Sequence, residues 1–463
     1  MSRSPRVLPV ELVGDGGPAP CVDGTDRPYL NLDAAASTSA LPEVADRVQS
    51  FLPAYSSVHR GAGFRSREAT AAYEAARDAA LRFAGRAPGG PDVAIMCRNT
   101  TEALNHLAYR LRLEPNDVIA TTVVEHHANL LPWARVAKRR FVECEPDGTF
   151  ALEAVTAALD AEPRPRLLTL TGASNVTGWS PPLQDIVDAA HDRGIRVVVD
   201  GAQLAPHAAL PPDADFIAWS GHKMYAPFGA GVLVGPRDVF EVGDPFLAGG
   251  GAVDLVDLDE VVWTAPPDRE EAGSPNVIGA VALHAAIDTL GDIGWEAIAR
   301  HDDEVGSALR KGLAALPGVR LLGPDTATPT LPLATFVIEG IPHALVAARL
   351  SAEFAIGVRH GCFCAHPYLL RLLGLTAGEI AHYKDAVLSG DRREVPGAVR
   401  ASAGVSTSLD DVARLLHAVS AIIATEPPVP YQQDPATGDY WPTSSVPGWS
   451  DSDRGPGASC ARG

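Results

Sequence analysis

The sequence predicts an α/β protein in which a mostly parallel sheet flanked by helices is followed by a second, smaller α+β domain. Short β-branched runs alternate with longer helical patterns through most of the chain, which is the order that a parallel sheet with crossover helices requires. Between about residues 90 and 235 the strand-like runs are apolar throughout, as in strands that are buried on both faces. With 463 residues, 46% of them hydrophobic, the chain is long enough for two domains.

The helices and strands of the first part of the chain are predicted from local sequence patterns. Residues 66–84 are alanine-rich with apolar side chains repeating at i, i+4, and Ser66 is the expected N-cap of this helix. Residues 181–194 predict a helix that is entered at Pro181 and closed at Gly194. Buried strands are predicted at residues 118–124, 166–171, 196–200 and 216–219.

The pattern changes after two further helical runs, residues 276–290 and 295–316. Beyond them we expect strands at 319–322, 334–338 and 356–359, with helices at 342–354 and 408–424. From residue 426 the chain is rich in Pro, Asp, Ser and Gly, which predicts a flexible tail. The expected division is therefore an N-terminal segment packing with the small domain (1–30), a large domain (31–290), a small domain (291–425) and a tail (426–463).

Composition and charge exclude several classes of protein. The formal net charge is −19, and so acidic a surface repels phosphate backbones and anionic headgroups, so we expect no nucleic-acid partner and no membrane partner. The first residues contain no apolar signal segment, and no apolar run is long enough to span a bilayer. Six scattered cysteines are too sparse for a disulfide framework and suit a reducing compartment, so a cytoplasmic protein is predicted.

Two polar residues follow predicted strands, at the ends where open parallel sheets bind ligands. Lys223 comes shortly after the strand 216–219, and Asp200 ends the strand 196–200. A desolvated lysine is held in the neutral form that condenses with an aldehyde, so Lys223 is a candidate Schiff-base residue. Asp200 is suited to keep a pyridinium nitrogen protonated. Taken singly, a solvated loop lysine and a helix-capping aspartate explain the two residues as well.

Two further segments have both a functional and a structural interpretation. Thr100 and Thr101 begin a helix predicted to run to about Arg112, where free N–H groups would favour a phosphate, although a plain N-cap fits the same pattern. His126 and His127 follow the strand 118–124. Adjacent residues at a strand end point apart, which disfavours a metal site and favours a histidine that stacks on an aromatic ring.

The segment from Arg359 to Pro367 contains two closely spaced cysteines. If it were extended, His360, Cys362, Cys364 and His366 would lie on one face and suggest a zinc site. Strand spacing separates such ligands too widely for one tetrahedral ion, so a reactive thiolate beside arginine and histidine charge is preferred. No metal is predicted.

Together these segments resemble the class V, fold-type I pyridoxal-phosphate family, and in particular its cysteine desulfurases and selenocysteine lyases of the sulfur-mobilisation type. The resemblance runs from about Tyr29 to Ala424, and its strength lies in the family order of the motifs rather than in any one of them. The motifs are LDAAAS (32–37), VHRG (58–61), NTTE (99–102), EHHAN (125–129), SN (174–175), DGAQ (200–203), SGHK (220–223), EAGSPN (271–276) and the Cys364 segment.

The resemblance implies a role for each site residue. Lys223 would form the Schiff base with pyridoxal 5'-phosphate and move the substrate's Cα proton, His126 would stack on the cofactor ring, and Cys364 would be the nucleophile. The other cofactor-binding residues would be Thr100, Thr101, Asn175, Asp200, Gln203, Ser220, His222 and Ser274. Arg359 and Arg400 would bind the substrate carboxylate, for which a guanidinium fork is well suited.

The implied activity is conversion of L-cysteine to L-alanine, with a persulfide left on Cys364 for a sulfur-acceptor protein. Ser274 stands where the family usually has a threonine that reaches the phosphate of the partner subunit, which implies a homodimer. The chain departs from the family pattern in three places. The stretch between Cys364 and Arg400 is longer than in the family, by an insertion at about 377–395. Cys362 and Phe363 stand at positions where the family has histidine-like residues, and the tail after Pro427 has no counterpart in the family pattern. The alternatives are therefore a related lyase, aminotransferase or epimerase of a specialised pathway, and a non-catalytic persulfide carrier.

Overall fold

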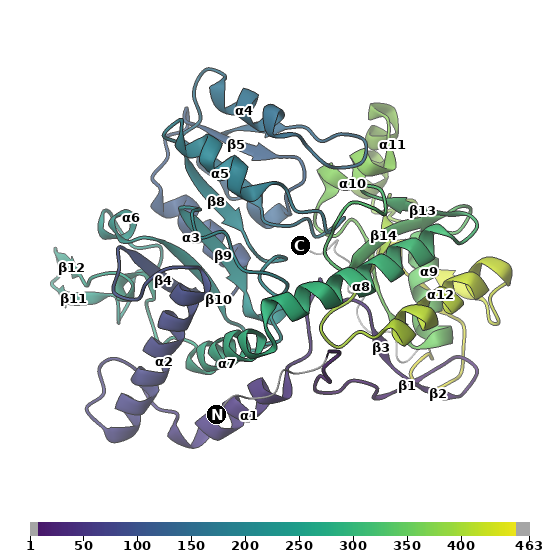
Figure 1. Cartoon of the computed structure of the whole chain (residues 1–463), viewed down its shortest axis with the longest axis horizontal. Helices are drawn as coiled ribbons and strands as arrows, with labels where there is room; N and C mark the ends of the chain where they lie inside the picture. Colours follow the sequence, from purple (N-terminus) through teal and green to yellow (C-terminus); the bar gives the residue numbers. More distant parts are fainter. Residues whose placement is uncertain (1–7, 451–463) are drawn as a thin grey trace.

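The structure is a computed structural model that describes residues 8–450 (Figure 1). Its largest sheet has seven strands in the order β4-β10-β9-β8-β7-β5-β6. Strands β5 to β9 are parallel, whereas β10 pairs antiparallel with both β4 and β9, so the predicted mostly parallel sheet is confirmed. The strands are β4 (Asp92–Cys97), β5 (Val118–Thr122), β6 (Lys138–Val142), β7 (Leu167–Thr171), β8 (Arg196–Asp200), β9 (Phe216–Ser220) and β10 (Gly231–Pro236).

Helices cover this sheet on both faces, which is why every residue of β5, β7 and β9 is buried. α3 (Thr100–Arg110) packs on β9 and β10, α5 (Leu183–His191) on β8, and α2 (Phe64–Phe83) on β4. The predicted N-cap of α2 is wrong: the helix begins earlier, with Gly63 at the cap, and Ser66 lies buried inside its first turn. The remaining helices of this part are α1 (Pro42–Phe51), α4 (Leu152–Asp160), α6 (Arg237–Glu241) and α7 (Val277–Ile293).

A second, antiparallel sheet has the order β13-β14-β17-β16. The long helix α8 (Trp295–Ala314) runs from the large sheet toward it, and α9 (His343–Phe354) and α12 (Leu409–Ala424) lie beside it (Figure 1). Its strands are β13 (Val319–Leu322), β14 (Leu333–Ile338), β16 (Arg359–Gly361) and β17 (Ala398–Ser402). The single strand expected at 356–359 is split, because β15 (Ile356–Gly357) pairs instead with the N-terminal β3 (Leu30–Asn31).

The N-terminal segment runs along the second sheet. Val10 N–H donates to Val405 O, and Val22 N–H donates to Ala352 O, both at 2.9 Å. Within it, β1 (Pro18–Pro20) and β2 (Asp26–Pro28) form a short antiparallel pair. Residues 1–7 of the expected segment 1–30 lie outside the described residues.

The insertion and the C-terminal segment are both folded. After α10 (His366–Leu373), the insertion forms α11 (Ala377–Leu388), which projects at the edge of the molecule (Figure 1). The expectation of a flexible tail from residue 426 is wrong as far as residue 450, because β18 (Tyr431–Gln433) and β19 (Tyr440–Pro442) form a hairpin. Its neighbour Trp449 donates from Nε1 to Pro20 O at 2.6 Å, so aromatic side chains anchor a stretch that has few aliphatic ones. Residues 451–463 lie outside the described part.

Between residues 8 and 450, no single helix has the length and apolar composition of a membrane span. Only α7 and α8 meet that test, as a pair bent by 79° at the break between them.

Candidate active site

A cavity of about 290 Å³ lies at the carboxyl ends of β8 and β9, where open parallel sheets bind ligands. The structure brings together here every site residue predicted from the sequence except Ser274. The predicted residues that line it are Thr100, Thr101, His126, Asn175, Asp200, Gln203, Ser220, His222, Lys223, Arg359, Cys364 and Arg400.

Lys223 ends a 3₁₀ turn that directly follows β9. The turn is fixed by Gly221, whose N–H donates to Ala230 O at 2.7 Å. Burial lowers the pKa of Lys223 to about 8, and this effect outweighs the attraction of Asp200, which acts in the opposite direction. About a tenth of the amine is therefore neutral at pH 7 and about half at pH 8, far more than for an ordinary lysine.

Asp200 is the last residue of β8 and is buried at the base of the cavity. Its Oδ1 accepts a hydrogen bond from Ala202 N–H at 3.0 Å, which orients the carboxyl group. Burial raises the pKa of Asp200, while this hydrogen bond and Lys223 oppose the shift. A cationic ring nitrogen beside the carboxyl would reverse that shift, because an opposite charge favours the ionised form.

The side chains of His126 and His127 have different surroundings, as predicted for adjacent residues that point apart. His126 lines the cavity, and its Nδ1 accepts from Ala128 N–H at 3.0 Å, which leaves the ring proton on Nε2. Burial lowers its pKa to about 3, so the ring is a neutral, flat surface. His127 instead stacks on His366, with ring centroids 5.1 Å apart, and donates from its backbone N–H to Cys364 O at 2.7 Å.

One end of the cavity is formed by the N-terminus of α3. Asn99 caps this helix by accepting from Glu102 N–H at 3.0 Å, and Thr100 N–H donates to Ser220 Oγ at 2.8 Å. The backbone of Asn99 lies so close to β10 that a Cβ on Gly231 would come within 2.6 Å of its Cα. Thr101 and the neutral His222, whose pKa burial lowers to about 4, complete a set of donors suited to a phosphate.

The two arginines predicted to bind the substrate carboxylate are joined by a residue that the sequence interpretation gave no role. Asp33 Oδ1 lies 3.1 Å from Arg400 Nη2, and Asp33 Oδ2 lies 3.2 Å from Arg359 Nε. Arg400 also donates from Nη1 to Asn175 O at 2.8 Å, and its buried Nε has no hydrogen-bond partner. Asp33 belongs to the quoted LDAAAS motif, but nothing in that spacing indicated two arginines from the far end of the chain.

The loop that carries Cys364 is held in an unusual conformation. Phe363 and Cys364 both have left-handed backbones, with φ of 55° and 53°. Asn175 Nδ2 donates to Phe363 O at 2.6 Å, which fixes the loop against the cavity wall. Because the chain turns here, Cys364 faces the active-site cavity and Cys362 lines a different one. The extended arrangement that suggested zinc is therefore not formed.

Ser274 is exposed and does not line the active-site cavity of its own chain. The preceding Gly273 donates from N–H to Gly250 O at 2.7 Å, which joins this loop to the base of the hairpin β11 (Val253–Val256) and β12 (Val261–Trp263). In Figure 1 that hairpin projects from one edge of the molecule.

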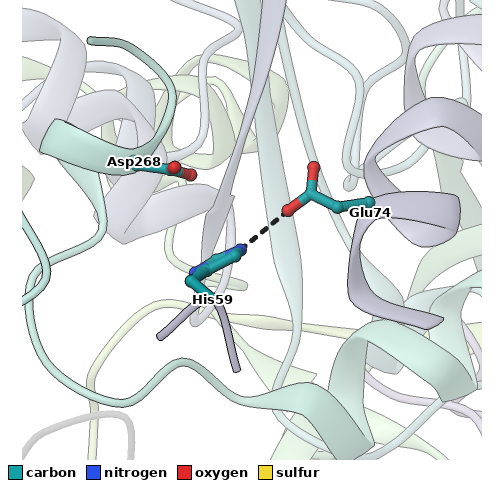
Figure 2. Close-up of side chains that lie close together, drawn as sticks. All are labelled: His59, Glu74 and Asp268. Carbon is teal, nitrogen blue, oxygen red and sulfur yellow. Dashed lines mark hydrogen bonds and ion pairs between the residues drawn. The ribbon is translucent and has the colours of Figure 1, made fainter. Parts of the chain in front are cut away.

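Figure 2 shows His59, Glu74 and Asp268, whose potential metal-ligand atoms lie within 4.8 Å of one another. Arg77 is already paired with both carboxylates of this group, because its Nη1 lies 2.8 Å from Glu74 Oε1 and 2.7 Å from Asp268 Oδ1. A metal ion would have to displace this guanidinium. The group is an ion-pair cluster, and through the 2.8 Å contact of Arg77 Nη2 with Glu271 Oε2 it anchors the segment that leads to Ser274.

Glu125 is a second buried residue near the site that the sequence interpretation gave no role. Thr122 Oγ1 donates to its Oε1 and Asn129 Nδ2 donates to its Oε2, both at 2.7 Å. Burial nevertheless raises the pKa of Glu125 to about 8. The sequence feature that could have identified Glu125 is its position directly before His126 in the EHHAN motif.

Comparison with known proteins gives consistent findings. The sequence model of the family described as "Aminotransferase class-V" matches residues 30–415. A probable cysteine desulfurase of Vibrio cholerae is 34% identical over 405 residues, covering 85% of this chain and 93% of the relative. The apo structure of a cysteine desulfurase from Thermococcus onnurineus superposes with a TM-score of 0.75 at 31% identity, covering 85% of this chain and 94% of that one. A cysteine desulfurase of Escherichia coli, solved in an S-sulfonic acid form, gives a TM-score of 0.71 at 32% identity, with coverages of 84% and 94%.

Proposed function

The chain belongs to the class V aminotransferase family and is an enzyme of the cysteine desulfurase type, and from this premise we propose that it converts L-cysteine to L-alanine and keeps the sulfur as a persulfide on Cys364. The observation that supports the proposal is the sharing of one cavity by Lys223, Asp200, Arg400 and Cys364. These are an amine, an acid, a carboxylate-binding group and a thiol, which together meet the needs of this reaction.

The donor set of the cavity fits pyridoxal 5'-phosphate. Lys223 supplies a partly neutral amine, Asp200 a buried carboxyl at the base, and His126 a neutral flat ring. Thr101, Ser220 and His222 supply hydroxyl and imidazole groups near a helix N-terminus. When bound, this cofactor supplies an aldehyde for the substrate amine and a ring that accepts electrons from the bonds broken at Cα.

The chain's own groups bind the substrate and move its protons. Arg400 and Arg359 hold the substrate carboxylate, with Asp33 fixing the orientation of both guanidinium groups. Lys223, in its neutral form, removes the proton from Cα and later returns a proton to the product. Asp200 stabilises positive charge at the base of the cavity, and His126 covers one face of the site.

Cys364 performs the sulfur step. Its thiolate attacks the sulfur of the bound cysteine, a new S–S bond forms, and the bond between Cβ and sulfur breaks. Cβ takes up a proton, so L-alanine leaves and the sulfur stays on Cys364 as a persulfide. An acceptor with a thiol must then remove this sulfur before the next turnover.

The test is to incubate the holoenzyme with L-cysteine and a reductant and to measure alanine and sulfide. We expect both products in equal amounts from the wild type and neither from Lys223→Ala. Absence of alanine above that control would overturn the proposal. A Lys311→Ala variant, changed in an exposed helical lysine, is the matched control for an unrelated loss of charge.

The proposal extends to a homodimer that shares its sites. The hairpin beside Ser274 exposes a row of large apolar side chains, with Leu255 64% and Leu258 98% exposed in the single chain. A second copy of this chain would cover them and bring Ser274 to the phosphate end of its partner's cavity.

Two further expectations are retained as part of the proposal. The first is the division into a large domain (31–290) and a small domain (291–425), with the N-terminal segment against the latter. The second is a reducing, cytoplasmic location, which rests on the six scattered cysteines of the sequence being too sparse for a disulfide framework.

A further inference from the structure

A second and larger cavity, of about 710 Å³, lies on the other side of the Cys364 loop. Cys362 and His366 line it, Cys364 lines only the active-site cavity, and Arg359 lines both. Its volume is in the range of about 300–1,000 Å³ that small-molecule sites occupy. These two cavities therefore adjoin at one short loop.

Much of the wall comes from two segments, the expected insertion at 377–395 and the C-terminal hairpin. One part belongs to the insertion, including Arg392 and Val395, and another to the turn of the C-terminal hairpin, including Gln433 and Asp439. That hairpin follows residue 415, where the match to the family model ends. The hairpin part of the wall therefore lies beyond the residues that the family model matches.

The two segments are hydrogen-bonded to each other, which fixes this part of the cavity wall. Arg392 N–H donates to Pro435 O at 2.8 Å, and Gln433 Nε2 donates to Arg393 O at 2.8 Å. The contact is close, because a Cβ on Gly438 would come within 2.5 Å of Arg392 O.

Each of the two segments contacts a different histidine: the insertion contacts His343 of α9, and the hairpin contacts His360 of β16. His343 Nε2 lies 3.1 Å from Val395 O, and His360 Nε2 lies 3.4 Å from Asp439 Oδ1. Both partners are acceptors, so each Nε2 carries the proton and each Nδ1 is left with a lone pair. Both Nδ1 atoms are buried without a hydrogen-bond partner, and burial lowers the pKa of both rings to about 4. Buried polar atoms of this kind call for a donor that the protein does not provide.

Arginines outnumber carboxylates in the wall of the second cavity. Four arginines line it against two carboxylates, and two of the four are already paired, Arg359 with Asp33 and Arg393 with Asp391. Among the described residues no carboxylate pairs with Arg320, whose Nη1 makes only a long hydrogen bond of 3.4 Å to Leu372 O. Guanidinium groups recognise carboxylates and phosphates.

We propose that this second cavity binds a small organic anion that also bears O–H or N–H donors, such as a hydroxy acid or an amino acid. Arg320 and Arg392 receive the anionic group, and the Nδ1 atoms of His343 and His360 accept from its donors. The site does not depend on the chemistry proposed for Cys364, so either proposal can fail without the other.

The test measures binding to the holoenzyme by titration calorimetry, with no turnover required. The probes are citrate and tricarballylate, which differ only by the hydroxyl group of citrate, and inorganic phosphate as an anion without a carbon skeleton. We expect citrate to bind with one site per chain and tricarballylate to bind about tenfold more weakly, the effect of one lost hydrogen bond to a buried acceptor. Binding by phosphate as tight as by citrate would overturn the organic part of the proposal.

Variants locate the site. Arg320→Gln should weaken citrate binding about tenfold or more, as should His360→Phe, which keeps a ring of similar size. Arg164→Gln, changed in an exposed arginine elsewhere, and Arg400→Gln, changed in the active-site cavity, should both retain it. The proposal is overturned if no probe binds, if Arg320→Gln binds citrate like the wild type, or if Arg400→Gln abolishes binding.

Discussion

The carboxylate of Asp33 divides its two oxygens between Arg400 and Arg359, at 3.1 and 3.2 Å. Asp33 lies shortly after β3, Arg400 in β17 and Arg359 in β16, so three distant parts of the chain meet at one cavity. Arg400 is buried with one nitrogen unpartnered, and burial lowers its pKa. Asp33 therefore offsets a charge that would otherwise be costly to bury.

Replacement of Asp33 by Ala is expected to weaken substrate binding. Both guanidinium groups lose their common anchor, so we expect KM for L-cysteine to rise about tenfold, the effect of about 1.4 kcal/mol, with a smaller change in kcat. Steady-state kinetics check this, and the cofactor absorbance should stay as in the wild type. Asp160→Ala, changed in an exposed ion pair with Arg193, is the control, and an unchanged KM in Asp33→Ala would contradict the role assigned here.

Cofactor uptake should depend on pH through Lys223. Its pKa is lowered from 10.5 to about 8, so the amine is protonated below pH 8 and neutral above it. Because only the neutral amine attacks an aldehyde, the rate at which the apoenzyme takes up pyridoxal phosphate should rise between pH 7 and 9. Stopped-flow absorbance measures this rate. A rate that is flat or falling over that range would be inconsistent with a buried, partly neutral lysine.

The two cysteines of one loop should behave differently. Cys364→Ser should abolish alanine formation from L-cysteine while leaving the cofactor absorbance intact, because the serine keeps the cavity but not the nucleophile. Cys362→Ser, changed in the residue that faces the second cavity, should retain most of the activity. If Cys364→Ser turned over cysteine normally, a related lyase or aminotransferase would be the better description. Product analysis by mass spectrometry distinguishes these outcomes.

Glu125 should make stability depend on pH. Its folded pKa is raised to about 8 from 4.5, so between these values the unfolded chain releases a proton that the folded chain retains. The free energy of unfolding should thus fall as pH rises from 5 to 8, by at most about 1.4 kcal/mol per pH unit. Glu125→Gln lacks this titration, so its stability should improve relative to wild type over the same range. Urea unfolding at several pH values measures the difference, and parallel curves would refute it.

The dimer proposal makes a hydrodynamic prediction. Leu258→Asp together with Leu255→Asp places charge on the exposed face of the hairpin, so the wild-type dimer should become a monomer. Sedimentation velocity measures this change. Val13→Asp alters another exposed apolar residue and should remain dimeric, and a wild type that sediments as a monomer would remove the basis for a shared site.

The sequence predicted which residues share the candidate cavity largely because strand ends are local features. Asp200 and Lys223 directly follow apolar runs, and parallel topology then brings the ends of β8 and β9 together. The sequence could not predict that Cys362 and Cys364 line different cavities. This depends on the left-handed backbones of Phe363 and Cys364, which are unusual for residues other than glycine. Asp33 was missed for another reason, since its partners lie more than 300 residues away along the chain.

The C-terminal hairpin was missed because composition alone suggested a flexible tail. Its stability comes from a few long-range contacts, such as those of Trp449 with Pro20 and Tyr431 with Glu353, which composition does not reveal. The division of strand 356–359 has a similar origin, because the partner of β15 is an N-terminal strand of only two residues.

The hydrogen bonds between the insertion and the C-terminal hairpin also predict that the two segments occur together in related sequences. A chain that had only one of them would leave Arg392 N–H or the amide of Gln433 without its partner, and one wall of the second cavity would be open. Selection should therefore gain or lose the two segments together, although some forty residues separate them in the gene. Related sequences should therefore contain both segments or neither, which a comparison of sequences can check.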